Sequence, residues 1–164
     1  MLRRLLPLLI CLAGFHRPFA TAAPASTADY AFVHVWPGWR EASSFERLSE
    51  YFGGQESTGR DSIHRTQPTA RAGYYFLVRV KNAGALAGAR FELRVIDQDH
   101  PEPQLHLFPI DLTRGEQVHQ LGLTGTDWPR GRTAHPVAWQ LTLHAADGHI
   151  LATQKSFLWE KPAK

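Results

Sequence analysis

The chain has 164 residues, of which 43% are hydrophobic and 20% are charged, and this composition excludes a mostly disordered protein. Its formal net charge is +3, but Arg3, Arg4 and Arg17 lie in the first 22 residues. Removing these three arginines from the 18 basic residues leaves 15, which balances the 15 acidic residues. A neutral remainder lacks the basic surface that nucleic-acid binding needs, so we expect no nucleic acid among the partners.

The first 22 residues have the pattern of a secretory signal peptide. Arg3 and Arg4 give a positive start, the run from Leu5 to Phe15 is apolar, and Ala20-Thr21-Ala22 supplies the small residues of a cleavage site. The apolar run is too short to cross a membrane, which needs roughly 20 residues. We therefore predict cleavage after Ala22, no membrane span after that cleavage, and a periplasmic or secreted location.

The rest of the chain has the length of one domain. Removing 22 residues from 164 leaves 142, enough for one hydrophobic core. We expect a flexible lead-in over 23–29 and a single domain over 30–161. The one cysteine, Cys11, lies in the leader, so the domain is expected to have no disulfide.

The domain begins with a predicted strand and a predicted helix. Tyr30–Trp36 alternates with the period of a strand, with Val33 and Val35 on one face, and Pro37-Gly38 is expected to end it. Ser43 and Glu46 have the spacing of a capping box, and an aromatic stripe follows it. Together they predict a short amphipathic helix over 44–52 that packs on a sheet, followed by a loop over 53–61.

Further strands follow at short spacing, and Asp147-Gly148 has the sequence of a type I′ hairpin turn. In a two-residue turn of that type, His144 would pair with Leu151 and Ala146 with His149. The predicted strands are Ser62–Thr66 at a sheet edge, Gly73–Asn82, a strand through Phe91, Leu93 and Val95, Leu105–Leu112, Val118–Leu123, Val137–Ala145 and Ile150–Trp159.

Seven or eight strands joined by short turns, with one short α-helix after the first strand, predict an all-β antiparallel sandwich. The segment Ala72-Gly73-Tyr74-Tyr75-Phe76 is similar to the strand that carries the immunoglobulin tyrosine corner. The domain thus resembles immunoglobulin-like and fibronectin type III-like domains in architecture. That resemblance implies the sandwich fold and no particular activity.

Large aromatic side chains stand beside predicted turns and are candidate ligand-binding residues. Trp39 follows Pro37-Gly38, and Trp128 follows Asp127 in a loop rich in Thr and Gly. Exposed tryptophan rings can anchor a protein partner or stack on a sugar, because they offer a large contact area at low entropy cost. We therefore expect Trp39, Trp128 and Asp127 to form the binding surface.

Two further groups are candidate metal ligands. His144 and His149 are expected to be diagonal neighbours across the last hairpin, within reach of one cation, although zinc requires a third ligand. Asp97, Asp99 and Glu102 lie in a loop stiffened by Pro101 and Pro103, and closely spaced carboxylates suit a hard cation. In both cases a solvated surface is the competing interpretation.

The sequence contains no motif for a phosphate loop, a dinucleotide site, a nucleophile elbow or a zinc protease. It therefore favours an exported binding or interaction module without a cofactor, whose partner is an envelope or extracellular protein. One alternative is a carbohydrate-binding module that uses the loop tryptophans. Another is a histidine-based metal-binding protein or metal-dependent enzyme.

Overall fold

The structure is a computed structural model that describes residues 29–46 and 62–160. The predicted signal peptide, most of the lead-in, the loop predicted over 53–61 and most of the helix predicted over 44–52 lie outside the described residues.

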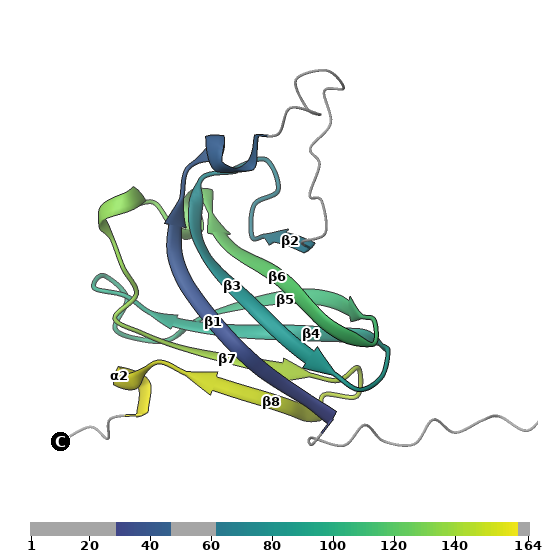
Figure 1. Cartoon of the computed structure of the whole chain (residues 1–164). Helices are drawn as coiled ribbons and strands as arrows, with labels where there is room; N and C mark the ends of the chain where they lie inside the picture. Colours follow the sequence, from purple (N-terminus) through teal and green to yellow (C-terminus); the bar gives the residue numbers. More distant parts are fainter. Residues whose placement is uncertain (1–28, 47–61, 161–164) are drawn as a thin grey trace, which may run out of the picture.

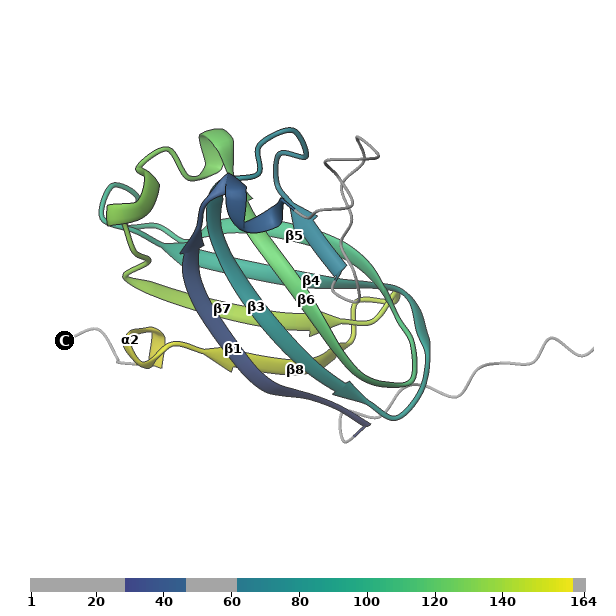
Figure 2. The ribbon, with the colours of Figure 1, turned by 45° about the horizontal axis from the view of Figure 1, so that its top comes forward.

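The described residues form eight strands in two four-stranded sheets, which confirms the predicted all-β sandwich. Figure 1 shows the two sheets stacked with their strands crossing, and Figure 2 shows the same layers tilted. The first sheet, in the order β1-β3-β6-β2, consists of β1 (Tyr30–Arg40), β3 (Gly73–Asn82), β6 (Gly115–Thr124) and β2 (Ser62–Arg65). The second sheet, in the order β5-β4-β7-β8, consists of β5 (Gln104–Leu112), β4 (Leu86–Ile96), β7 (Ala138–His144) and β8 (Ile150–Lys155).

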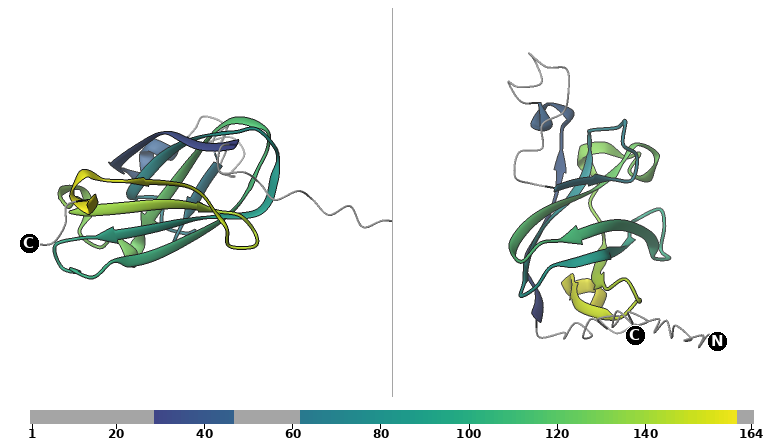
Figure 3. Two further views of the ribbon diagram at one scale, coloured as in Figure 1. Left: turned by 90° about the horizontal axis from the view of Figure 1, so that it is seen from below. Right: turned by 90° about the vertical axis from the view of Figure 1, so that its right-hand side faces the viewer.

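The core lies between the sheets, where alternate residues of the central strands point inward. Phe76 of β3, Phe91 of β4 and Leu141 of β7 are fully buried. The side views show the two layers that enclose this core, and β1 lies beside β8 on one side of it (Figure 3). The other side lies between the edge strands β2 and β5.

β1 is longer than predicted, and a bulge within it shifts by one residue the positions whose side chains point into the core. The register with β3 shifts between Phe32 and His34, so Val33 is an extra residue and its side chain is 48% exposed. Tyr30 and Val35 point into the core on either side of this bulge. Pro37 does not end the strand, because β1 is a sheet edge where a residue without an N–H is tolerated.

The region after β1 departs from the predicted helix start. Ala42–Phe45 forms the short 3-10 helix η2, and Glu46 after it is extended. Ser43 lies inside η2, whose N-terminal cap is Glu41, and Glu46 has extended backbone instead of a place in a first helical turn, so the capping box predicted for Ser43 and Glu46 is wrong.

β2 is an edge strand, as predicted, but it pairs with β6 in parallel. The strictly antiparallel sandwich expected from the short connections therefore has one exception. A parallel pair needs a long crossover, and here β3, β4 and β5 lie between the two strands in the sequence.

The hydroxyl group of Tyr75 ties β3 to the chain that precedes it. Its hydroxyl donates to the carbonyl oxygen of Arg71, four residues earlier, at 2.7 Å, and accepts from Arg65 Nε at 2.8 Å. The ring is 1% exposed and lies on the outer face of its sheet against Phe45. A Cβ at Gly122 would lie 2.4 Å from the Tyr75 ring, so only glycine at position 122 leaves room for this ring.

The last hairpin differs from the predicted type I′ turn. Gly148 N–H donates to the Ala145 carbonyl oxygen, and Gly148 has a positive φ of 88°, whereas Asp147 does not. A type I′ turn needs positive φ at both central residues. The observed turn is one residue longer, so His144 pairs with Ile150. β8 ends at Lys155, and Phe157–Glu160 forms the short helix α2 where the predicted strand would have continued to Trp159.

Replacement of Gly122 by alanine tests how tightly Tyr75 is held. We expect Gly122→Ala to lower the free energy of unfolding by about 1–3 kcal/mol, the usual cost of overpacking. Gly38→Ala is the matched control, because a Cβ at Gly38 meets nothing within 4 Å. Chemical denaturation measures both, and equal stabilities for the two variants would contradict this account of the Tyr75 site.

Candidate functional site

A small pocket lies at the end of the sandwich where β4 passes into β5 and β6 passes into β7. Its volume is about 170 Å³. Val95 and Leu123, which belong to the core, form its apolar floor. Its polar lining comes from the β4–β5 loop, from the start of β5 and from the β6–β7 connection, namely Asp97, His100, Gln104, His106, Thr126, Asp127 and Arg130.

The neighbouring β2–β3 loop is fixed to the end of β6 by hydrogen bonds to Thr124, a fully buried residue. The backbone N–H of Gln67 donates to Thr124 Oγ1, and Thr124 Oγ1 donates to the Gln67 carbonyl oxygen, both at 3.0 Å. Thr124 N–H donates to Thr66 Oγ1 at 3.0 Å. These hydrogen bonds hold the end of β6 in place, and the β6–β7 connection begins there.

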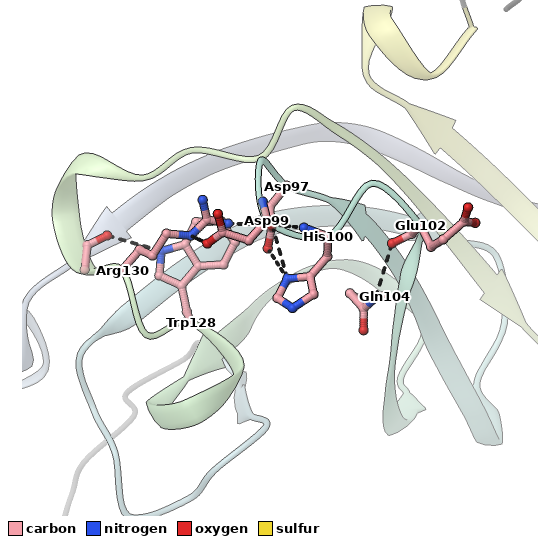
Figure 4. Close-up of polar contacts among 8 residues, drawn as sticks. Asp97, Asp99, His100, Glu102, Gln104, Trp128 and Arg130 are labelled. Atoms are coloured by element: carbon pink, nitrogen blue, oxygen red, sulfur yellow. Dashed lines mark hydrogen bonds and ion pairs between the residues drawn. The ribbon is translucent and has the colours of Figure 1, made fainter.

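Asp97 organises the β4–β5 loop (Figure 4). Its Oδ1 accepts hydrogen bonds from the N–H groups of Asp99 and His100, each at 2.8 Å. The His100 ring nitrogen Nδ1 lies 3.2 Å from both carboxylate oxygens. Burial alone would raise the pKa of Asp97, but the hydrogen bonds from His100, Asp99 and Arg130 outweigh it and lower the pKa to about 2. Asp97 is therefore ionised at neutral pH.

Arg130 joins the two loops of the pocket. Its Nη2 lies 2.5 Å from Asp97 Oδ1 and its Nε lies 3.0 Å from Asp99 Oδ2. Two of the three carboxylates that the sequence proposed for a cation, Asp97 and Asp99, thus share one guanidinium, which comes from the β6–β7 connection. Glu102 is exposed, and its carbonyl oxygen accepts from Gln104 Nε2. The part of the chain that the structure describes contains no group of three or more His, Cys, Asp or Glu residues placed to hold a metal ion.

Trp128 lines the same pocket, but the expectation that its ring is exposed is wrong. The side chain is 5% exposed and packs against Tyr74 at a ring distance of 4.8 Å. Its Nε1–H donates to the carbonyl oxygen of Gly131 at 3.2 Å. Because the loop closes over the end of the core, Trp128 supports the pocket and does not offer an open ring face.

Trp39 lies at the same end of the sandwich but does not line the pocket. Its side chain is partly buried against the core, and its Nε1–H donates to Glu41 Oε1 at 2.8 Å. Trp36, three residues earlier on β1, is more exposed, at 42%, and its ring contacts the His34 ring in a tilted arrangement. Trp39 and Trp128 therefore do not form the open aromatic platform on which the carbohydrate alternative depended.

Asp127 is exposed at the pocket and is accompanied by a histidine that the sequence did not single out. Burial lowers the pKa of His106, and the nearby negative charge of Asp127 acts in the opposite direction. The proximity of the Asp127 charge to His106 and the ion pair of Asp97 with Arg130 both arise because strand connections bring distant residues to one end of the sandwich. Sequence spacing alone gives no signal for either pair.

The register that made His144 and His149 diagonal neighbours is wrong because the turn is longer, and His144 pairs with Ile150 instead of Leu151. His144 is 8% exposed, and its Nδ1 lies 3.2 Å from the Gly148 carbonyl oxygen. Its Nε2 lies 3.3 Å from Glu92 Oε2, an ion-pair distance whose angles do not make a hydrogen bond. His149 is exposed on the turn, where its N–H donates to Asp147 Oδ1.

Comparisons with known proteins give no relative: no family model matches the chain, and neither the curated proteins nor the solved structures contain a significant match. Within the described residues, every helix is too short or too polar to cross a membrane. A function for the site is therefore inferred from its own residues and distances.

Replacement of Asp97 tests how much its ionised carboxylate contributes to the stability of the fold. Its folded pKa of about 2 lies below the ordinary 3.8, so its stabilising contribution is complete above about pH 4 and is lost as the pH falls towards 2. We expect Asp97→Asn to lower the free energy of unfolding at neutral pH by on the order of 1–2 kcal/mol, allowing for solvent screening. The difference from the unmodified protein should shrink towards zero at about pH 2.

Urea denaturation across this pH range measures the effect. Glu102→Gln, in the same loop, removes an exposed carboxylate and is the matched control. A stability difference for Asp97→Asn that does not change with pH would contradict the role given to the ionised carboxylate.

Proposed function

We propose that this protein is an exported binding module that contacts a protein partner, in the cell envelope or outside the cell, through the pocket end of the sandwich. The observation that carries the proposal is the ion-paired pocket itself, where Asp97 and Arg130 hold two loops in place on a braced sandwich. Binding residues concentrate on loops that a rigid scaffold positions. The exposed residues Asp99, His100 and Asp127 at this end are the groups available to a partner.

The protonation state of Asp97 favours a role in recognition over a role in proton transfer. Asp97, with a pKa of about 2, stays ionised and already accepts several hydrogen bonds. A general acid or base works best with a pKa near the operating pH. A fixed ion pair instead presents a constant pattern of charge, which contributes to the specificity of a binding surface.

An immunoglobulin-like or fibronectin type III-like architecture is part of this proposal. Two four-stranded sheets and the hydrogen bond from the Tyr75 hydroxyl to the Arg71 carbonyl support it. In sandwiches of this kind the loops cluster at the two ends, and one end serves as the recognition surface in variable domains. The pocket likewise lies among loops at one end of the sandwich.

Export is supported by the leader pattern in residues 1–22. We expect the protein recovered from its host's envelope or medium to begin at Ala23, which mass spectrometry of the N-terminal peptide measures. Ala22→Phe should block processing, because signal peptidase requires a small residue there. Thr21→Phe, at the more tolerant neighbouring position, should still be processed. An N-terminal peptide that retains Met1 in the unmodified protein would contradict export by this route.

Site-specific photocrosslinking in the host tests the binding surface. A crosslinking residue at position 127 should give a discrete adduct with one partner protein, because this position lies at the pocket. A crosslinking residue at position 114, in the β5–β6 turn at the opposite end of β6, is the control. Equal adducts from both positions, or none from position 127, would count against the pocket end as the interaction surface.

A further inference from the structure

A buried histidine of the first sheet lies directly against the short edge strand β2. His119 of β6 is 1% exposed, and its Nδ1 lies 3.4 Å from Nε2 of His64, a partly buried residue of β2. The two rings are stacked at a centroid distance of 5.6 Å. Phe91 of β4 contacts the His119 ring edge-on at 5.3 Å. The His119 ring is thus enclosed between β2 and the core.

The contact between the two imidazoles requires that only one of the facing nitrogens carries a proton. A neutral imidazole has one N–H and one lone pair, so an N–H of one ring can point at the lone pair of the other. When both rings are protonated, every ring nitrogen carries a proton. Two N–H groups then face each other, and the hydrogen bond between His64 and His119 is lost.

The closed position of β2 keeps His119 in its neutral form. Nε2 of this ring has no hydrogen-bond partner among the residues that the structure describes, so a protonated ring would bury an N–H without an acceptor. Burial, and after it the charge of His64, lowers the pKa of His119 to about 4. Burial also lowers the pKa of His64. Both rings are therefore neutral at neutral pH.

The other charged groups near the two rings do not offset the cost of protonating His119. They line the groove between β2 with β6 and the strands β4 and β5, and they are Arg90 of β4 and Asp111 of β5. Asp111 Oδ1 accepts a hydrogen bond from Gly88 N–H at 2.7 Å. On β3, the residue opposite His119 is the apolar Val78. Because Arg90 and Asp111 carry opposite charges, burial remains the largest effect on the pKa of His119.

β2 is the element that can move to expose His119 to water. It has four residues, lies at the edge of its sheet and, among the described strands, hydrogen-bonds only with β6 (Figure 1). Elements with few buried contacts open locally at a lower free energy than the core. Thr66 and Gln67, just beyond β2, are held to Thr124 by hydrogen bonds. This junction can therefore stay fixed while residues 62–65 move.

We propose that acidification releases β2 from β6 while the two sheets stay folded, because the His119 ring gains water and a proton when β2 opens. A proton that the open form binds more tightly stabilises the open form. The pKa of His119 is about 4 with β2 closed and approaches the ordinary 6.5 when the ring is solvated. Opening therefore becomes more favourable as the pH falls from about 6.5 to about 4. It also brings water to Ala89 and Ile110, the core residues that line the groove.

Hydrogen exchange of backbone N–H groups, followed by NMR, measures the opening of β2. The sample is the chain from Ala23 onward, which retains every residue that the structure describes. After correction for the intrinsic pH dependence of exchange, the protection of the β2 N–H groups should fall roughly tenfold to thirtyfold between about pH 7.5 and about pH 5. The N–H groups that join β4 and β7 in the other sheet should keep their protection.

His119→Phe removes the titrating ring and keeps an aromatic side chain against Phe91. In this variant the protection of β2 should stay within about threefold over the same pH range. His149→Gln is the matched control, because His149 is exposed on the last hairpin turn, and it should keep the full pH dependence. If His119→Phe does not fold, the unmodified protein decides the matter. Constant protection of β2, equal loss of protection in β2 and β7, or a full pH dependence in a folded His119→Phe would overturn the proposal.

Discussion

Burial of apolar side chains between the two sheets is the interaction on which the rest of this structure depends. The single cysteine lies at position 11, so no disulfide within the chain reinforces the sandwich. Alternate residues of β3, β4, β6 and β7 fill the space between the layers, and many are fully buried. At about 25 cal/mol per Å² of apolar surface, this burial is the dominant stabilising contribution. The pocket exists only because this core fixes the strands around it.

The strands were predictable because the alternation of buried and exposed residues is a local signal. Gly73–Asn82 forms as one strand with the predicted bounds, and Ser62 begins an edge strand as expected. The errors came from single-residue shifts. An extra residue at Val33 reverses the face of β1, and a turn one residue longer than expected separates His144 from His149. A shift of one residue moves every later side chain to the other face.

The candidate site was less predictable than the strands because it is assembled from residues far apart in the sequence. The sequence located Asp97, Asp99, Asp127 and Trp128, and three of these four line one pocket. It gave no signal that Arg130 would supply the positive charge between the two aspartates. It also misjudged Trp128, because a tryptophan beside turn residues can close the end of a core as well as extend from it. His64 and His119 meet through a parallel strand pair that local patterns do not encode.

Buried polar groups differ in how completely the structure satisfies them. At the pocket end, the carboxylate of Asp97 has hydrogen bonds and a cationic partner that it shares with Asp99. Nε2 of the buried His119, in contrast, has no hydrogen-bond partner among the described residues. A satisfied network suits a surface that is recognised by shape and charge.

The edges of the two sheets have a consequence for the protein in a crowded compartment. Unpaired strand edges are templates for aggregation, and proline, bulges and short length disrupt them. β1 carries both a bulge and Pro37, β5 contains Pro109, β2 has four residues and β8 has six. The edges at β1, β2 and β5 therefore resist the addition of a strand from another molecule. A sandwich that no disulfide reinforces is in this way protected along three of its four edges from pairing with a second copy.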